Sequence, residues 1–176
     1  MCYSPRPNEA DLEAKYQYLS ERENIGALAN PTPRSLRLDT KREVFLTNII
    51  EKHHDLKSQK VLDVGGGDGR LLRPFLKKGC YCYLVDFNPK PLPNIQRLGS
   101  TLNDIPTGDL FDIIICSHVL EHVTEPGQLL RDIRSRLSDN GVAYIEVPSQ
   151  IWQGIPINLD PVTHINFFTV SSCKMH

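Results

Sequence analysis

The sequence lacks the features that mark membrane-spanning, secreted or nucleic-acid-binding proteins. No segment approaches the roughly 20 consecutive apolar residues that a membrane-spanning helix needs. The first residues, MCYSPRP, contain no apolar core of a signal peptide. The formal net charge is −1, and residues 1–58 carry as many acidic as basic side chains, so no basic surface for nucleic acid is predicted. We therefore expect a cytoplasmic protein whose partners are small molecules and that binds neither nucleic acid nor membranes.

The cysteines show no metal-binding spacing. The five cysteines are an odd number, and their spacing matches no known metal-binding pattern. Cys80 and Cys82 flank Tyr81 on an expected strand, so their side chains point to the same face of a sheet. A free buried cysteine behaves as a small hydrophobic residue. The sequence thus predicts buried thiols and no metal or redox site made of cysteine.

The composition is typical of one globular domain. A chain of 176 residues can bury a continuous core, and 40% hydrophobic with 23% charged residues is an ordinary balance. Ahead of residue 59 we expect two helices, one capped by Asn8 and running to about Asn24, and one that starts at the capping box Thr40-x-x-Glu43. The second helix is expected to bury Phe45, Leu46 and Ile49.

Strands and helices alternate from Lys60 onward. The sequence Thr124-Glu-Pro predicts the start of a helix, and Asp139-Asn-Gly141 predicts a turn into a strand that ends near Val147. Alternation of this kind predicts an α/β fold, Rossmann-like and doubly wound, with a mostly parallel sheet whose ligands bind at the carboxyl ends of the strands. The inward-facing residues of the predicted helix are Leu129, Leu130, Ile133 and Leu137.

The most informative segment is residues 61–70, VLDVGGGDGR. Val61, Leu62 and Val64 predict a buried strand, which the glycines end in a tight turn before an amphipathic stretch. Glycine accepts positive φ and lets a ligand lie against bare main chain, and a helix start offers unpaired N–H groups to an anion. This arrangement predicts a cofactor site.

Two acidic residues narrow the choice of cofactor. The dinucleotide pattern is G-x-G-x-x-G, whereas here the third glycine, Gly69, falls one place early. Asp63 lies in the strand, where a carboxylate anchors either the loop or a bound ammonium group. Asp86 ends the next apolar segment, at the usual interval for an acidic residue that hydrogen-bonds ribose hydroxyls. A strand, D-x-G-x-G-x-G and a second strand ending in Asp resemble the class I methyltransferases, which use S-adenosylmethionine.

The resemblance covers about residues 40–170, because FDIIICSHVLEHV (111–123) and the segment 141–147 are similar to the fourth and fifth strands of that family. It implies an N-terminal helical cap (1–58), an S-adenosylmethionine-binding core (59–150) and a partial acceptor-side segment (151–176). The implied cofactor-binding residues are Asp63, Gly65, Gly66, Gly67, Asp86, Phe87, Asn103 and Ser117.

The same resemblance assigns parts of the cofactor to these residues. The glycine turn would lie beside the methionine part, Asp86 would bind the ribose, and Phe87 would lie against the adenine. Thr101 stands where many relatives carry an acidic residue, so the contact to the adenine amino group is left to Asn103, Asp104 or the backbone.

Three histidines are candidate catalytic residues: His118 and His122 after the expected fourth strand, and His164 in the segment expected to close over the acceptor. Each could contact substrate, act as a general base or order its own loop. A zinc pair at His118 and His122 is the least favoured interpretation because the sequence shows no third ligand, so no metal is predicted. Glu146 is expected either to satisfy a neighbouring donor or to act in catalysis. Arg42 is expected in solvent unless it reaches the cofactor carboxylate.

The carboxyl-terminal part predicts a sheet truncated after the fifth strand, since the family sheet has seven strands. That strand would be an edge, which invites pairing with a second copy of the chain unless a missing C-terminal part covers it. Three functions stay open: methyl transfer from S-adenosylmethionine to O, N or C of a small molecule, a non-catalytic S-adenosylmethionine-binding or partner module, and an NAD-dependent oxidoreductase. The early position of Gly69 and the carboxylate of Asp63 within the strand argue against the NAD-dependent oxidoreductase.

Overall fold

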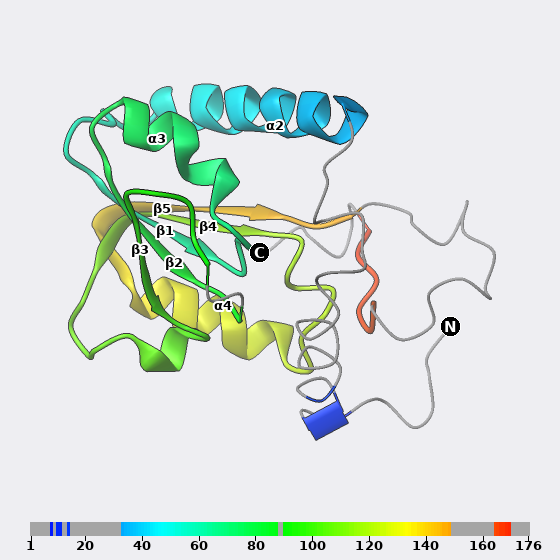
Figure 1. Cartoon of the computed structure of the whole chain (residues 1–176). Coiled ribbons are helices and arrows are strands. Elements are labelled where there is room, and N and C mark those ends of the chain that lie inside the picture. Colours follow the sequence, from blue (N-terminus) through cyan, green and yellow to red (C-terminus); the bar gives the residue numbers. More distant parts are fainter. Residues whose placement is uncertain are drawn as a thin grey trace.

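A parallel sheet forms the centre of the protein (Figure 1). The computed structural model describes residues 8, 10, 11, 14, 33–87, 90–148 and 164–169. The strands are β1 (Lys60–Val64), β2 (Tyr81–Val85), β3 (Ile95–Gly99), β4 (Phe111–Ser117) and β5 (Leu137–Glu146). The helices are α2 (Pro33–Glu51), α3 (Arg73–Lys77) and α4 (Pro126–Ser135), with short 3-10 turns η1 (Arg70–Leu72) and η2 (Leu102–Asp104).

The five strands lie in the order β3-β2-β1-β4-β5, and every neighbouring pair is parallel. The predicted Rossmann-like α/β fold is therefore confirmed. The order reverses between β1 and β4, and this switch point opens a crevice for ligands at the carboxyl ends of the strands. Within the described residues β5 forms one edge of the sheet, and self-association through that edge stays a prediction.

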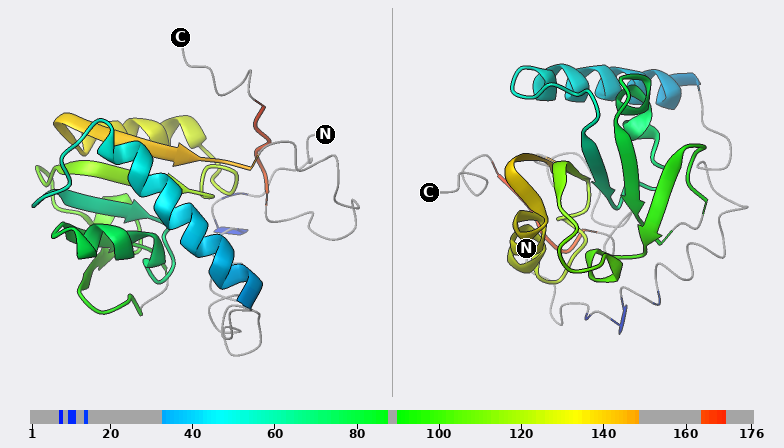
Figure 2. Two further views of the ribbon diagram at one scale, coloured as in Figure 1. Left: turned by 90° about the horizontal axis from the view of Figure 1, so that it is seen from above. Right: turned by 90° about the vertical axis from the view of Figure 1, so that its left-hand side faces the viewer.

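Two layers of helix cover the sheet, α2 and α3 on one face and α4 on the other (Figure 1). Strand residues alternate between the faces: Val61 and Ile113 pack toward α2 and α3, whereas Leu62 and Ile114 pack toward α4. Helix α2 runs across the strands (Figure 2). Both faces are buried, which explains why the central strands consist of almost continuous apolar runs.

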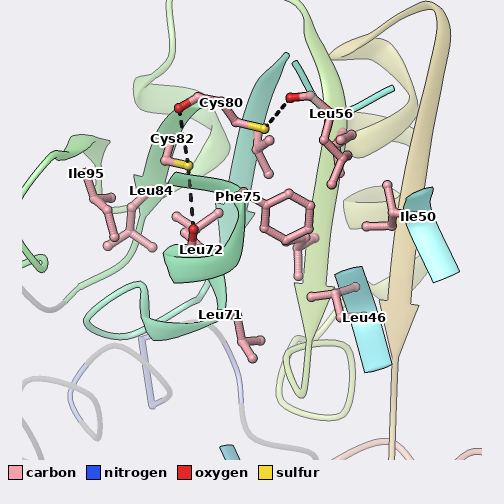
Figure 3. Close-up of a cluster of buried hydrophobic side chains, with 13 residues drawn as sticks. Leu46, Ile50, Leu56, Leu71, Leu72, Phe75, Cys80, Cys82, Leu84 and Ile95 are labelled. Carbon is pink, nitrogen blue, oxygen red and sulfur yellow. Dashed lines mark hydrogen bonds between the residues drawn. The ribbon is translucent and has the colours of Figure 1, made fainter. Parts of the chain in front are cut away.

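Phe75 of α3 lies at the centre of the cluster between the sheet and α2, with Leu46 and Ile50 of α2 beside it (Figure 3). The same cluster holds Cys82 of β2 and Cys80, which directly precedes β2, while Tyr81 between them is exposed. Cys80, Cys82 and Cys116 are free and buried, so the prediction of buried thiols is confirmed for them. Burial raises the pKa of Cys80 to about 11 and those of Cys82 and Cys116 to about 12, and such thiols are poor nucleophiles.

The predicted start of the second helix was wrong. Helix α2 begins at Pro33, where a missing backbone N–H costs nothing, and Thr40 lies inside it. Glu43 does not cap α2, because its carboxylate forms an ion pair with Arg73 of α3. The buried face of α2 also differs: Leu46 is buried as predicted, but Phe45 is 60% exposed.

Other helix boundaries are partly confirmed. The Asn8 side chain accepts a hydrogen bond from the Asp11 N–H (3.0 Å), as a cap should, and most of the helix predicted to follow lies outside the described residues. Helix α4 begins at Pro126, with Glu125 rather than Thr124 preceding it. Leu137 faces inward as predicted, but as part of β5, where it pairs with Phe111 before the register shifts.

Candidate functional site

The glycine turn after β1 is shaped by close packing on one side and open space on the other. Gly65, Gly67 and Gly69 all have positive φ, between 64° and 82°. A Cβ on Gly66 would lie 2.0 Å from the Asp63 carboxylate, and one on Gly65 would lie 2.6 Å from Val119. A Cβ on Gly67 would meet nothing within 4 Å. The turn therefore has no room for side chains at Gly65 and Gly66, and Gly67 exposes its backbone to an open space.

Asp63 lies directly beneath this turn and is fully buried. Neither of its carboxylate oxygens has a hydrogen-bond partner in the part of the chain that the structure describes. Burial, reinforced by the charge of Asp86, raises the pKa of Asp63 to about 7, although the charge of Arg42 opposes the rise. A buried carboxylate without partners is costly, so this one is suited to a cationic or hydrogen-bonding ligand.

Asp86 lies where β2 ends and is joined to the glycine turn. Its carboxylate accepts a hydrogen bond from the Gly67 N–H (2.8 Å), and its backbone N–H donates to Gly99. Phe87, the next residue, is 47% exposed. The structure thus brings together the turn, Asp63 and Asp86, as the sequence predicted, and leaves the Phe87 ring accessible.

Asp104 and Asn103 follow β3, on the opposite side of Asp86 from the turn. The Asp104 carboxylate accepts hydrogen bonds from the backbone N–H groups of Ser100 (2.7 Å) and Thr101 (2.9 Å), and these bonds lower its pKa. Thr101 and Asp104 together form the capping box of η2. The Asp104 carboxylate already accepts these two backbone hydrogen bonds. The exposed side chain of Asn103 is therefore better placed than Asp104 to contact a ligand.

Arg42 of α2 reaches across to the ends of β4 and β5. Its guanidinium donates to the Ser117 hydroxyl (2.6 Å) and to the Glu146 carboxylate (2.9 Å), and Ser117 also donates to Glu146 (2.5 Å). Burial raises the pKa of Glu146, but these hydrogen bonds and the Arg42 charge more than offset it, so the pKa is lowered. The prediction that Glu146 satisfies neighbouring donors is confirmed, and the default expectation of a solvated Arg42 was wrong.

His118 and Glu121 form a second polar group next to Glu146. His118 has φ 59°, unusual for a residue other than glycine, and its Nδ1 lies 3.2 Å from Oε1 of Glu121. An ionised carboxylate only accepts hydrogen bonds, so the proton of this contact lies on Nδ1. Nε2 lies 3.7 Å from the Glu146 carboxylate. The side chain of His118 is 42% exposed and that of Glu121 1%, so a buried carboxylate orients an accessible imidazole.

The segment 164–169 packs against the loop after β4 (Figure 1). The backbone N–H groups of Ile165 and Asn166 both donate to the Glu121 carbonyl, and the Asn166 side chain donates to the carbonyls of Leu120 and Val123. This packing brings the ring centroid of His164 to 4.7 Å from the ring centroid of His122.

All three predicted catalytic histidines therefore lie close together, joined by Glu121. Glu121 was not among the residues predicted from the sequence. The only sequence signal for it is its position between His118 and His122.

Comparison with known proteins shows what this chain is similar to. A family model described as a methyltransferase domain matches residues 8–174. A ubiquinone biosynthesis O-methyltransferase of Rickettsia canadensis is 25% identical over 114 residues, which cover 58% of this chain and 48% of that protein. The mitochondrial enzyme of the same name from Schizosaccharomyces pombe is 26% identical over 122 residues, 61% of this chain and 42% of that protein.

The fold matches solved structures as well. The DhpI–SAH complex superimposes with a TM-score of 0.58 at 17% identity, covering 77% of this chain and 69% of that one. The chain spans about half the length of the curated relatives it matches. No helix among the described residues combines the length and apolar character needed to cross a membrane.

Proposed function

Because the chain belongs to the family of methyltransferase domains, whose model covers almost its whole length, we propose that it transfers a methyl group from S-adenosylmethionine to a small-molecule acceptor. One observation carries the proposal: a fully buried Asp63 carboxylate without partners among the described residues lies beneath a glycine turn whose outer side is open. That pair of features suits a ligand with an ammonium group. An NAD site would also use an open glycine turn, but NAD has no ammonium group to pair with Asp63.

The residues around the turn would hold the cofactor. Asp63 would face its ammonium group and Gly65 to Gly67 would lie along its methionine part. Asp86 would accept hydrogen bonds from the ribose hydroxyls in addition to the one from Gly67. Phe87 and Asn103, both exposed, would contact the adenine. When bound, S-adenosylmethionine supplies an electrophilic methyl group, so the protein mainly has to position the acceptor.

The polar groups beyond β4 and β5 would receive the acceptor. His118 would take the proton of an acceptor hydroxyl at Nε2 while Glu121 holds Nδ1–H, the division of roles seen whenever a carboxylate orients a basic imidazole. Arg42 and Ser117 would keep Glu146 in place beside it, and the predicted contact of Ser117 with the cofactor stays a prediction. His122 and His164 would line the same side. Since the relatives are named for ubiquinone biosynthesis, a phenolic hydroxyl on a quinone-like ring is the acceptor class to test first.

Calorimetric titration with S-adenosylmethionine and with NAD, followed by a methyl-transfer assay on phenolic acceptors, tests the proposal. We expect saturable binding of S-adenosylmethionine only, and turnover with at least one acceptor. Binding without turnover on any acceptor would favour the non-catalytic module instead. Preference for NAD would overturn the assignment. The cytoplasmic location stays a prediction, as one relative is named as mitochondrial.

A further inference from the structure

We propose that Glu121, His122 and His164 form a binding site for one divalent transition-metal ion of the zinc class. Each residue offers one donor atom, and the three donor atoms all lie within 4.8 Å of one another. The site is separate from the glycine turn and from Asp63 and Asp86. It is an inference about metal binding and does not depend on the proposed methyl transfer.

The donor set determines which ions fit. Two imidazoles and one carboxylate are ligands that Zn²⁺ and its transition-metal neighbours accept, whereas Mg²⁺ and Ca²⁺ prefer oxygen donors throughout. Three protein ligands leave a tetrahedral ion one position for water. Tetrahedral Zn²⁺ holds its donors about 3.3 Å apart, given metal–ligand distances of about 2.0–2.1 Å. The largest distance between two donor atoms would therefore shrink by about 1.5 Å around the ion.

Glu121 has the burial and the spare oxygen that such a site needs. Its side chain is 1% exposed, and its Oε2 has no hydrogen-bond partner among the described residues. Its Oε1 lies 3.2 Å from Nδ1 of His118 and 3.8 Å from Nε2 of His122, so the carboxylate faces both rings. A ligand carboxylate held by an outer hydrogen bond is the usual arrangement at metal sites, since the bond fixes its orientation. Glu121 thus has both an oxygen for the ion and a neighbour that orients it.

Hydrogen bonds to backbone carbonyls of the loop after β4 place the third ligand, His164. The Ile165 and Asn166 N–H groups bond the Glu121 carbonyl at 2.8 and 3.1 Å, and the Asn166 amide bonds Leu120 and Val123. These bonds hold His164 beside His122, with their rings tilted by 30°. Two imidazoles face a buried carboxylate, each from a different segment of the chain. An ion there would join the segment 164–169 to the loop after β4.

Metal titration of the untagged chain, stripped by dialysis against a chelator, tests the site without S-adenosylmethionine or acceptor. Co²⁺ serves as a spectroscopic probe, because four- or five-coordinate Co²⁺ absorbs visible light far more strongly than the hydrated ion. We expect one Co²⁺ per chain with these intense bands, displacement by Zn²⁺ and none by an equal concentration of Mg²⁺. Zn²⁺ should also raise the melting temperature.

Variants locate the ion. His164→Ala and Glu121→Gln should each weaken Zn²⁺ binding by at least about 100-fold, since even the loss of an outer partner costs up to that much. His53→Ala, a change at an exposed histidine just after the end of α2, should leave the affinity unchanged. Circular dichroism checks that the Glu121→Gln variant is folded. If it is not, His164→Ala, a change on a partly exposed segment, tests the metal site by itself. Absence of saturable binding, or equal affinity in wild type and His164→Ala, would overturn the proposal.

Discussion

Replacement of Asp63 by Asn should make the stability of the protein without cofactor less sensitive to a rise in pH from about 4 to 7, and should at the same time weaken cofactor binding. Asp63 is fully buried without partners among the described residues, and its pKa is raised from 3.8 to about 7, mainly by burial. Below pH 3.8 the carboxyl is mostly protonated in both the folded and the unfolded chain, so its titration does not lower the free energy of unfolding. As the pH rises to about 7 the unfolded chain ionises and the folded one does not, and stability falls.

The size of this effect follows from linkage. A rise in pKa from 3.8 to about 7 corresponds to a loss of about 4 kcal/mol in the free energy of unfolding, most of it between about pH 4 and 7. The asparagine side chain of the variant does not titrate, so the variant should lack this loss. Asp68, Asp104, Glu121 and Glu146 have lowered pKa values and act in the opposite direction. They are common to both proteins and cancel in the comparison.

Urea unfolding followed by circular dichroism at pH 4.5, 6 and 8 measures the difference. Asp109→Asn, a change at an exposed carboxyl before β4, is the matched control and should follow the wild-type pH dependence. Calorimetry at pH 8 should show that Asp63→Asn weakens S-adenosylmethionine binding by about 1.5–3 kcal/mol, the usual value of a charge-assisted hydrogen bond. If wild type and Asp63→Asn lose stability in parallel with pH, the carboxylate is not held without partners and the reasoning fails.

Other changes test the rest of the site. Asp86→Ala should weaken S-adenosylmethionine binding by on the order of 1.5–3 kcal/mol in calorimetry, and unchanged affinity would remove Asp86 from the site. Gly66→Ala should destabilise the fold by about 1–3 kcal/mol in urea unfolding because its Cβ would meet the buried carboxylate beneath it. Gly67→Val should keep the secondary structure but abolish cofactor binding, so a variant with wild-type circular dichroism and affinity would show that the turn is not the site. With a hydroxyl acceptor, His118→Gln should lower kcat by about 100- to 10,000-fold with the cofactor affinity unchanged, while His53→Gln should have no effect; equal kcat values in the two variants would exclude His118 as the base.

Local sequence determined the fold class and the cofactor side of the site. The apolar run at Val61 to Val64, its glycines and the acidic residue ending the next strand are all encoded within a short stretch, and strand period and glycine φ are local properties. The parallel order of the strands follows from their alternation with helices. The helix start at Thr40 was mispredicted because Thr-x-x-Glu fits both a helix cap and a helix interior, and Glu43 pairs instead with Arg73 of another helix.

Only the tertiary structure decided which polar groups meet beyond β4 and β5, the proposed acceptor side. Arg42 meets Glu146, and His164 meets Glu121 and His122, across long stretches of chain that no local pattern connects. Sequence spacing locates side chains on a single helix or strand, whereas polar groups from several segments converge only where the carboxyl ends of parallel strands gather them at one edge of the sheet. The lack of partners around Asp63 within the described part of the chain is likewise a property of the packed core, since hydrogen bonding depends on every neighbour in space.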